Sequence, residues 1–440
     1  MSIEAGWQFQ CSNTTCLPFA TVTVSNIDNC QVACLAQVDC QALTFYRSSS
    51  NCELFADISN ETGNLSANID AVTMIAIDGT RIPLEPITTS TTITTVVCNF
   101  FLNQTTYAVS TNPYSVAVVD VNNDYKPDIV VTTSQVSGSV SVLLKADNGT
   151  FNAQLVYPVG SYSYSVAVVD VNNDNKRDII VANEGSNNVG VLLNAGNGTF
   201  NAQTTYIVVS NPYSVAVVDV NSDNKPDIIV ANSGSANVGV LLNAGSGNFN
   251  AQTTYTVGNN PHSVVVVDVN SDYKPDIITA NYGSNNVSVL LNAGNGTFSP
   301  QTTYVVSSSP SSVAVVDVNS DNKPDIIVAN EGSNTVGVLL NAGNGTFNPQ
   351  TTYTVGNNPY SVAVVDVNSD YKPDIITANY GSANVGVLLN AGNGTFNAQT
   401  TYTVGNEPYS VAVLDVNSDY KPDIIVANYG SNTVSVLLHC

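Results

Sequence analysis

Most of the chain alternates short, β-branched apolar runs with clusters of Asn, Gly, Ser and Pro. In one stretch the apolar runs cover residues 165–170, 178–182, 188–193 and 199–208, and turn-forming residues separate them. Runs of this length, rich in Val and Ile, are typical of β-strands. All are far shorter than the roughly 20 residues that a membrane-spanning helix needs. The pattern therefore predicts an all-β protein and no transmembrane segment.

This four-run pattern is repeated along the chain. The segment Asp-Val-Asn-Asn-Asp-Tyr-Lys-Pro-Asp at 120–128 has seven versions; the first spacing is 50 residues and the other five are 49. A fixed period of this size indicates a repeat architecture. Four antiparallel strands in each of seven repeats predict a seven-bladed β-propeller of four-stranded blades. A parallel β-helix or an open solenoid would need shorter or helix-containing repeats.

The ends of the repeat region complement each other. The chain stops after the third strand of the last repeat, and a segment like the fourth strand precedes the first repeat. We therefore expect residues 99–109 to pair with 434–439 and to close a ring that spans 99–440. Cys98 and Cys440 fall in one hairpin turn, so a disulfide between them would lock the ring. The alternative is two unpaired thiols.

Charge is concentrated in the repeated segments. The chain has 34 acidic and 11 basic residues, a formal net charge of −23. Apart from Lys176-Arg177 the basic residues are scattered, which argues against nucleic acid as a partner. Each repeated segment holds three Asp, so 7 × 3 = 21 of the 34 acidic residues lie in these segments. The acidity is therefore largely a property of seven local sites.

These segments have the composition of calcium loops. Asp at positions 1, 5 and 9 and Asn at position 3 offer four hard oxygen ligands, and a backbone carbonyl near position 7 plus water would complete the shell that Ca²⁺ prefers. Mg²⁺ fits less well, and zinc is not expected because the segments contain no Cys or His. We expect up to seven structural Ca²⁺ ions. The predicted ligands are Asp120, Asn122, Asp124, Asp128, Asp170, Asn172, Asp174, Asp178, Asp219, Asn221, Asp223, Asp227, Asp268, Asn270, Asp272, Asp276, Asp317, Asn319, Asp321, Asp325, Asp366, Asn368, Asp370, Asp374, Asp415, Asn417, Asp419 and Asp423.

Position 6 departs from the Gly that calcium loops commonly carry, because Asn or Tyr stands there. Asn tolerates the left-handed backbone conformation, and Tyr does so less easily. The alternative hypothesis is that the Asp residues only cap turns through Asx hydrogen bonds. In that case the clustered carboxylates would repel one another without compensation.

The seven Asp-x-Asn-x-Asp segments followed by Pro-Asp-Ile-Ile-Val resemble FG-GAP/VCBS-type repeats, which build integrin-alpha-like propellers and many secreted adhesion and carbohydrate-associated proteins. The resemblance covers residues 99–440. It implies that the metal loop and the turn between the third and fourth strands share one face. That turn is an Asn-Gly-Thr sequon in five repeats, so one face would carry metals and glycans. The predicted glycosylation sites are Asn13, Asn60, Asn64, Asn103, Asn148, Asn197, Asn286, Asn295, Asn344 and Asn393.

The opposite face holds the entries to the innermost strands, where tyrosines recur beside Asn-bearing turns. Aromatic rings beside amides suit a sugar or a partner peptide. The alternative is that these tyrosines pack between blades. The candidate ligand-binding residues are Tyr114, Tyr164, Tyr213, Tyr360 and Tyr409.

No catalytic residue is expected. Near-identical repeats do not build the single asymmetric constellation that catalysis needs, and the acids of the ring outside the loops are Asp147, Glu184, Glu331 and Glu407. No Ser/His/Asp arrangement stands apart from the repeats. The sequence therefore predicts a protein that is not an enzyme.

The first 98 residues hold six of the eight cysteines. Four of them, spaced x3, x5 and x11 from Cys30, resemble a PAN/apple-type module, a small disulfide-rich α+β domain that binds proteins or carbohydrates and often self-associates. We place it at residues 1–83, followed by a Thr-rich linker at 84–98. Spacing alone permits 15 connectivities for six cysteines. The resemblance implies the pairs Cys30–Cys52 and Cys34–Cys40, which leaves Cys11 with Cys16.

The even cysteine count, the ten sequons and the calcium loops predict an extracellular, oxidising location. Residues 1–7 do not form a signal peptide, so we expect the given chain to be a processed or truncated product. The first function hypothesis is a calcium-binding extracellular glycoprotein that acts in adhesion or recognition of a protein or carbohydrate. The second is a structural subunit that self-associates head-to-tail into a homopolymer through the N-terminal module or the linker.

Overall fold

The computed structural model describes residues 100–147 and 149–440, and the backbone of two strands nearer the N-terminus. Those strands, β1 (Pro18–Thr23) and β2 (Asn51–Phe55), form an antiparallel pair. The chain divides into two compact units, Met1–Thr95 and Val96–Cys440. In the described part, no helix is long and apolar enough to cross a membrane.

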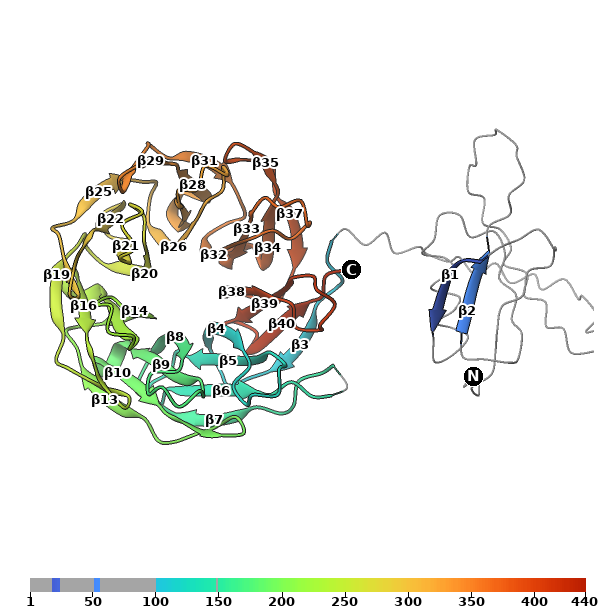
Figure 1. Ribbon diagram of the computed structural model, residues 1–440, viewed down its shortest axis with the longest axis horizontal. Helices are drawn as coiled ribbons and strands as arrows, with labels where there is room; N and C mark the ends of the chain where they lie inside the picture. Colours follow the sequence, from blue (N-terminus) through green and yellow to red (C-terminus); the bar gives the residue numbers. More distant parts are fainter. Residues whose placement is uncertain (1–17, 24–50, 56–99, 148) are drawn as a thin grey trace, which may run out of the picture. The chain divides into compact units, whose positions relative to one another are not determined.

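The second unit is a ring of seven four-stranded antiparallel sheets (Figure 1). The all-β, seven-bladed fold predicted from the repeat is thus confirmed. The strands of blades 1 to 3, from the axis outward, are β4 (Pro113–Val119), β5 (Asp128–Thr133), β6 (Ser139–Leu143) and β7 (Leu155–Pro158); β8 (Ser163–Val169), β9 (Asp178–Asn183), β10 (Asn188–Leu192) and β13 (Thr204–Ile207); and β14 (Pro212–Val218), β15 (Asp227–Asn232), β16 (Asn237–Leu241) and β19 (Thr253–Thr256). Those of blades 4 to 6 are β20 (Pro261–Val267), β21 (Asp276–Asn281), β22 (Asn286–Leu290) and β25 (Thr302–Val305); β26 (Pro310–Val316), β27 (Asp325–Asn330), β28 (Thr335–Leu339) and β31 (Thr351–Thr354); and β32 (Pro359–Val365), β33 (Asp374–Asn379), β34 (Asn384–Leu388) and β37 (Thr400–Thr403).

Blade 7 combines both ends of the ring. Its inner strands are β38 (Pro408–Leu414), β39 (Asp423–Asn428) and β40 (Thr433–Leu437), and its outer strand is β3 (Thr105–Ala108), which pairs antiparallel with β40. A further bridge between Phe101 and His439 extends this seam. Cys440 is disulfide-bonded. The predicted partner, Cys98, lies outside the described residues, as do the other six cysteine side chains, so the pairing stays a prediction.

The second strand of each blade shows why the repeats close on themselves. All six residues of β9 are buried, because one face of the strand packs on each neighbouring blade. Ile179 and Val181 pack against blade 1, whereas Ile180 and Ala182 pack against blade 3. Alternate side chains of a strand point to opposite faces. A repeated unit buried on both sides is stable only inside a closed or capped array.

The fourth apolar run of each repeat is not one strand, as the sequence pattern suggested. In blade 2 it splits into Thr199–Phe200 (β12), paired with Asn194–Gly196 (β11) in a small hairpin, and the outer strand β13. Asn197 and Gly198 at its tip have φ of 52° and 72°, the left-handed pair that a two-residue hairpin turn favours. The matching hairpins of blades 3 to 6 are β17 (Asn243–Gly245) and β18 (Asn248–Phe249); β23 (Asn292–Gly294) and β24 (Thr297–Phe298); β29 (Asn341–Gly343) and β30 (Thr346–Phe347); and β35 (Asn390–Gly392) and β36 (Thr395–Phe396).

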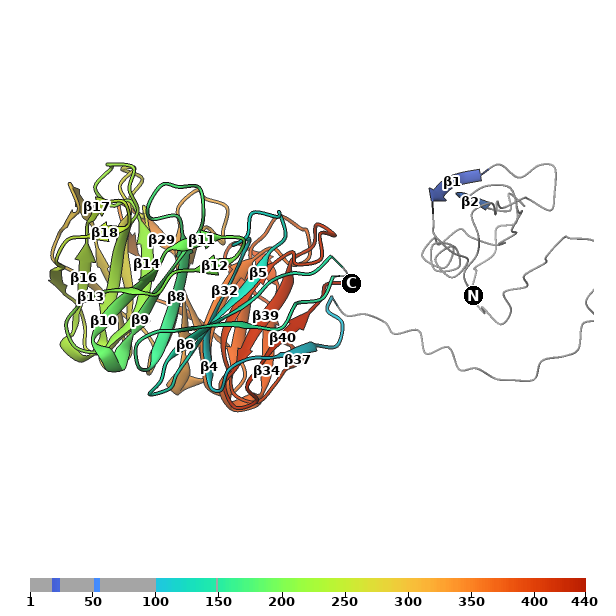
Figure 2. The ribbon, with the colours of Figure 1, turned by 90° about the horizontal axis from the view of Figure 1, so that it is seen from below.

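The two faces of the ring carry different connections. The seven repeated Asp segments, here called the Asp loops, join the first strand of each blade to the second and lie on the same face as the hairpins, the upper one in Figure 2. The opposite face, here called the entry face, holds the connections into the inner strands and the turns between second and third strands. Four of those turns contain a 3-10 helix: η1 (Glu184–Ser186), η2 (Ser233–Ser235), η3 (Glu331–Ser333) and η4 (Tyr380–Ser382).

Candidate functional site

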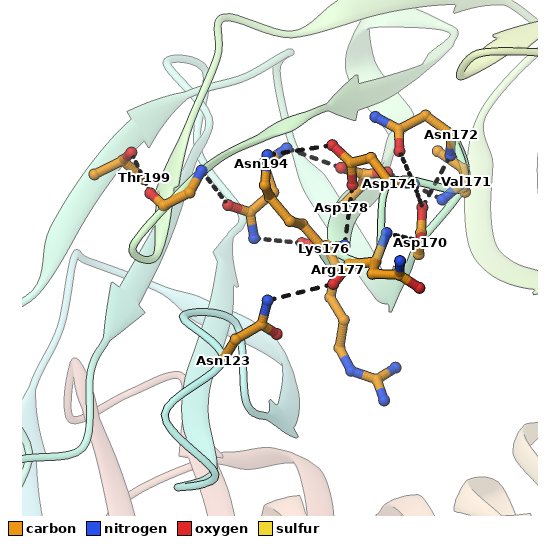
Figure 3. Close-up of polar contacts among 12 residues, drawn as sticks. Asn123, Asp170, Val171, Asn172, Asp174, Lys176, Arg177, Asp178, Asn194 and Thr199 are labelled. Carbon is orange, nitrogen blue, oxygen red and sulfur yellow. Dashed lines mark hydrogen bonds and ion pairs between the residues drawn. The ribbon is translucent and has the colours of Figure 1, made fainter.

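Each Asp loop is held by hydrogen bonds from its own backbone to its polar side chains. In blade 2, Asp170 accepts the N–H groups of Asn172 and Asp174 at 3.2 Å and that of Asn175 at 2.7 Å. Asn172 Oδ1 accepts the N–H of Asp174 at 3.0 Å, and Asp174 Oδ1 accepts that of Lys176 at 3.0 Å (Figure 3). The oxygens of positions 1, 3 and 5 therefore point into the loop.

The backbone of the Asp loops is left-handed at positions 4 and 6, with φ between 60° and 66° in every repeat. Asn and Ser occupy position 4, and Asn or Tyr occupies position 6. The tyrosines gain no packing in return, because Tyr125, Tyr273, Tyr371 and Tyr420 are 93–96% exposed. The left-handed turn that Gly commonly provides is thus made here by residues that carry a Cβ.

Position 9 differs from the other acidic positions because it is fully buried. Asp178 accepts the N–H of Val171 at 3.0 Å through one oxygen and that of Asn194 at 2.8 Å through the other. Burial raises the pKa of Asp178 to about 6, and the charges of Asp174 and Asp170 add to the rise, whereas the two N–H donors oppose it. The pKa of its counterparts in the other six loops is also raised, with burial as the main cause.

The hairpin residue Asn194 links neighbouring blades, a role that the sequence analysis missed. Its Nδ2 donates to the carbonyl of Val121 in blade 1 at 2.8 Å and to that of Arg177 at 2.9 Å. In blade 7 the ring nitrogen Nε2 of His439 lies 2.8 Å from the Val367 carbonyl. The signal was present as an Asn after Leu-Leu in five repeats. The residues that repeat the Asn194 bonds are Asn243, Asn292, Asn341 and Asn390.

The oxygen atoms of the Asp loops are of the chemical types that bind a hard cation. Carboxylate and carboxamide oxygens are the ligands that Ca²⁺ prefers, and the charges of positions 1 and 5 both act on position 9. In the described residues, however, no three carboxylate, imidazole or thiol groups converge closely enough to hold a metal. The hydrogen bonds from the loop backbone to the side chains of positions 1, 3 and 5 are those that the turn-capping alternative expects. Repulsion is also partly compensated, because the Lys at position 7 lies 3.2–3.9 Å from the Asp at position 5 in six loops.

On the entry face, the candidate tyrosines converge at the centre of the ring. Tyr114 stacks on Tyr164 at a centroid distance of 4.3 Å and contacts the tilted ring of Tyr409 at 4.2 Å, and its hydroxyl meets those of Tyr213 and Tyr360. Tyr114 is only 7% exposed. These side chains therefore pack on one another at the centre of the ring. A ligand role for them stays a prediction.

His262 and Ser311 occupy the same repeat position in the two remaining blades. The imidazole of His262 stacks between Tyr213 and Tyr282 at 4.1 and 4.3 Å. Its Nδ1 is buried without a hydrogen-bond partner among the described residues. Burial lowers the pKa of His262 to about 4, so the ring is neutral at physiological pH.

Three of the four acidic residues of the ring outside the Asp loops contact neighbouring side chains. Glu184 accepts from the carboxamide of Asn211, and Glu331 accepts from that of Asn358 at 3.3 Å. Asp147 pairs with Lys126. The fourth, Glu407, lies over Gly430.

The predicted glycosylation sites differ in exposure. Asn103 and the hairpin-tip residues Asn197, Asn295, Asn344 and Asn393 are exposed. The Asn286 side chain is half-buried, and its Oδ1 accepts from Asn281 at 2.8 Å. Asn13, Asn60, Asn64 and Asn148 lie outside the described residues.

The fold and the seven Asp loops place this protein in the class of repeat β-propellers. The model of the FG-GAP-like repeat family matches six overlapping stretches, 120–181, 170–230, 219–279, 268–328, 317–377 and 366–426, and the chain belongs to this family. A PAN domain matches residues 10–76. The resemblances to both are thereby confirmed. Both domains are typical of extracellular proteins.

Known structures share the fold at low sequence identity. A streptogramin B lyase has a TM-score of 0.55 and 14% identity over 78% of this chain and 98% of that one. BBS1N in complex with ARL6DN gives 0.56 and 12% over 77% and 97%. Virginiamycin B lyase from Staphylococcus aureus gives 0.54 and 14% over 76% and 98%. These likenesses show the fold alone. No curated protein sequence matches the chain.

Proposed function

We propose that this protein is a non-catalytic, extracellular recognition protein that binds a glycan or protein ligand through the entry face of its propeller. The proposal rests on one observation: the residues that differ between the repeats are concentrated on the entry face. On the Asp-loop face most positions are constant or alternate between two residues. On the entry face the repeats differ in charge and aromatic content, as His262, Glu331, Tyr380 and Glu407 illustrate. A scaffold that binds one ligand needs such local variation, because identical loops offer identical contacts.

The entry-face assignment is testable by adding a glycan to that face. Ser233 begins η2 in the sequence Ser-Gly-Ser, so Ser233→Asn creates a sequon on the entry face with one change. Produced in a glycosylating host, this variant is expected to lose retention on a glycan array or on cells that bind the unmodified protein. Asn295→Gln, which removes a sequon from the opposite face, is the matched control and is expected to bind as before. Equal binding by both variants would exclude the entry face.

We further propose that the Asp loops bind up to seven Ca²⁺ ions in a structural role. Support comes from the donor set of positions 1, 3, 5 and 9, and from the accumulated negative charge that a cation would offset. In blade 4 the set is Asp268, Asn270, Asp272 and Asp276. Chelation by EDTA is expected to lower the melting temperature, and Ca²⁺ is expected to restore it better than equal Mg²⁺. An unchanged melting temperature would contradict the proposal.

Two single changes in one loop sharpen the calcium test. Asp272→Asn is expected to reduce the calorimetric stoichiometry by one ion. Lys274→Gln removes the ammonium group 3.6 Å from Asp272, so that loop is expected to bind Ca²⁺ more tightly. If neither change alters the titration, the cation is held elsewhere.

A further inference from the structure

Four of the seven junctions between blades on the entry face share a capping contact. After the turn between second and third strands, an Asn in the left-handed conformation accepts the N–H of a residue in the next blade's entry loop. Asn187 accepts from Asn211, and Asn334 accepts from Asn358, both at 2.8 Å. Two further junctions have the same contact. In these junctions the carboxamide oxygen thus links neighbouring blades.

The junction between blades 6 and 7 lacks this carboxamide. Ala383 stands at the left-handed position, with φ of 48°, so the N–H of Glu407 lacks the carboxamide cap that four of its counterparts have. A cavity of about 470 Å³ that is open to solvent lies at this place, and its volume is within the range of small-molecule sites. Its lining residues are Tyr380, Gly381, Ala383, Asn406, Glu407 and Gly430.

Glu407 makes this cavity chemically distinct. At its repeat position five other blades have Asn or Ser and one has Tyr, all with positive φ, and Glu407 is itself strained at φ 54°. Its carboxylate lies over Gly430, where an added Cβ would stand 2.9 Å from Oε2. Besides partial burial, the charge of Glu407 and a hydrogen bond to it raise the pKa of Tyr380. The carboxylate is thus held beside an aromatic wall.

The donors and acceptors of the cavity favour hydroxyl groups. The Glu407 carboxylate accepts hydrogen bonds, whereas the uncapped Glu407 N–H donates, and the exposed Asn406 carboxamide does both. An ammonium group would satisfy only the acceptors. A hydroxyl both donates and accepts, and the C–H face of a sugar ring packs on an aromatic side chain such as Tyr380. We propose that this cavity is a binding site for one neutral pyranose residue of a glycan, with two neighbouring hydroxyls on Glu407.

The junction between blades 3 and 4 provides an internal comparison. Ala236 also replaces the capping Asn there, with φ of 49°, but Ser233 and Asn260 stand where Tyr380 and Glu407 stand in the proposed site. That junction lacks both the carboxylate and the aromatic wall. We therefore expect no pyranose site at this second place.

The test uses the full-length protein and a panel of neutral methyl pyranosides, with saturation-transfer NMR and titration calorimetry as readouts. At least one pyranoside is expected to bind the unmodified protein. Ala383→Asn restores the cap that four other junctions have and places a carboxamide in the cavity, so it is expected to weaken binding at least about tenfold. Glu407→Asn, which restores the common residue, is expected to do the same. Ala236→Asn is the control and should leave binding unchanged.

This site deepens the proposed recognition function and rests on it, but the two fail separately. Absence of binding by every neutral pyranoside, or binding that survives Ala383→Asn, would overturn the cavity assignment. Binding of an alkylammonium probe in place of the pyranosides would overturn the hydroxyl argument. In each case the Ser233→Asn experiment still reports whether the entry face binds a ligand of another kind.

Discussion

Replacement of His262 by Tyr tests what stabilises the centre of the entry face. Tyr stands at this repeat position in five other blades, so the variant keeps an aromatic ring between Tyr213 and Tyr282. It removes a buried imidazole whose pKa burial lowers to about 4 from an ordinary value of 6.5. Between pH 6.5 and 4 the unfolded chain binds more protons at this group than the folded protein does. The imidazole therefore costs stability as the pH falls through this window.

The size of this loss of stability follows from the lowered pKa of His262. At pH 4.5 the two pKa values correspond to a loss of about 2.5 kcal/mol relative to pH 7. The buried Asp residues at position 9 act in the opposite direction, because their raised pKa makes the folded state bind more protons in acid. They are unchanged in the variant, so they cancel when the two proteins are compared.

Denaturant unfolding of both proteins at pH 7 and pH 4.5, in EDTA, measures this difference. His262→Tyr is expected to lose about 2.5 kcal/mol less than the unmodified protein on acidification. His262→Gln also removes the titrating group, and should show the same pH behaviour with lower stability at both pH values because stacking is lost. Equal acid losses in all three proteins would refute the burial argument.

Three further predictions concern the ring. Asn243→Ala removes one bond to the Val171 carbonyl of the neighbouring blade and one to the Pro226 carbonyl of its own blade, and is expected to cost about 2–3 kcal/mol in denaturant unfolding, whereas Asn250→Ala, at an exposed side chain of the same blade, should cost little. Tyr273→Asn relieves a left-handed tyrosine and should gain about 1 kcal/mol in EDTA, measured by thermal unfolding; no gain would show that the loop tolerates Tyr. Peptide mapping without reduction is expected to recover Cys98 linked to Cys440, and a different partner for Cys440 would reject the predicted ring lock.

The sequence was most informative about features whose residue pattern recurs in all seven repeats. The blade number, the four strands of each blade and the position of the Asp loop between the first two strands follow from the 49-residue period and the β-branched runs, whereas the small hairpin before the outer strand in blades 2 to 6 does not. Position 6 is a clear case, because the sequence indicates a left-handed turn there even though Asn or Tyr rather than Gly occupies it. The backbone conformation of an Asp loop depends on neighbouring residues, so a short window of sequence is enough to predict it.

Contacts across blades were not predictable in the same way. Asp178 was assigned to metal binding, but the structure also shows a buried acceptor for the N–H of Asn194, 16 residues away on a hairpin. Tyr114 meets Tyr213 across 99 residues, because ring closure brings alternate blades to one axis. The cavity beside Glu407 arises from three substitutions in two repeats, each ordinary by itself. Only the ring geometry places them together.

The pairing of β3 with β40 has a consequence for how the protein is made. Ala108 and its partner Thr433 are 325 residues apart, and at 5–20 residues per second a ribosome needs roughly 15–65 s to cover that distance. Throughout this interval the outer strand of blade 7 has been synthesised but has no strand to pair with. An unpaired strand edge is a site for wrong association. Correct assembly of the ring thus depends on keeping this first segment unoccupied until the final blade has emerged.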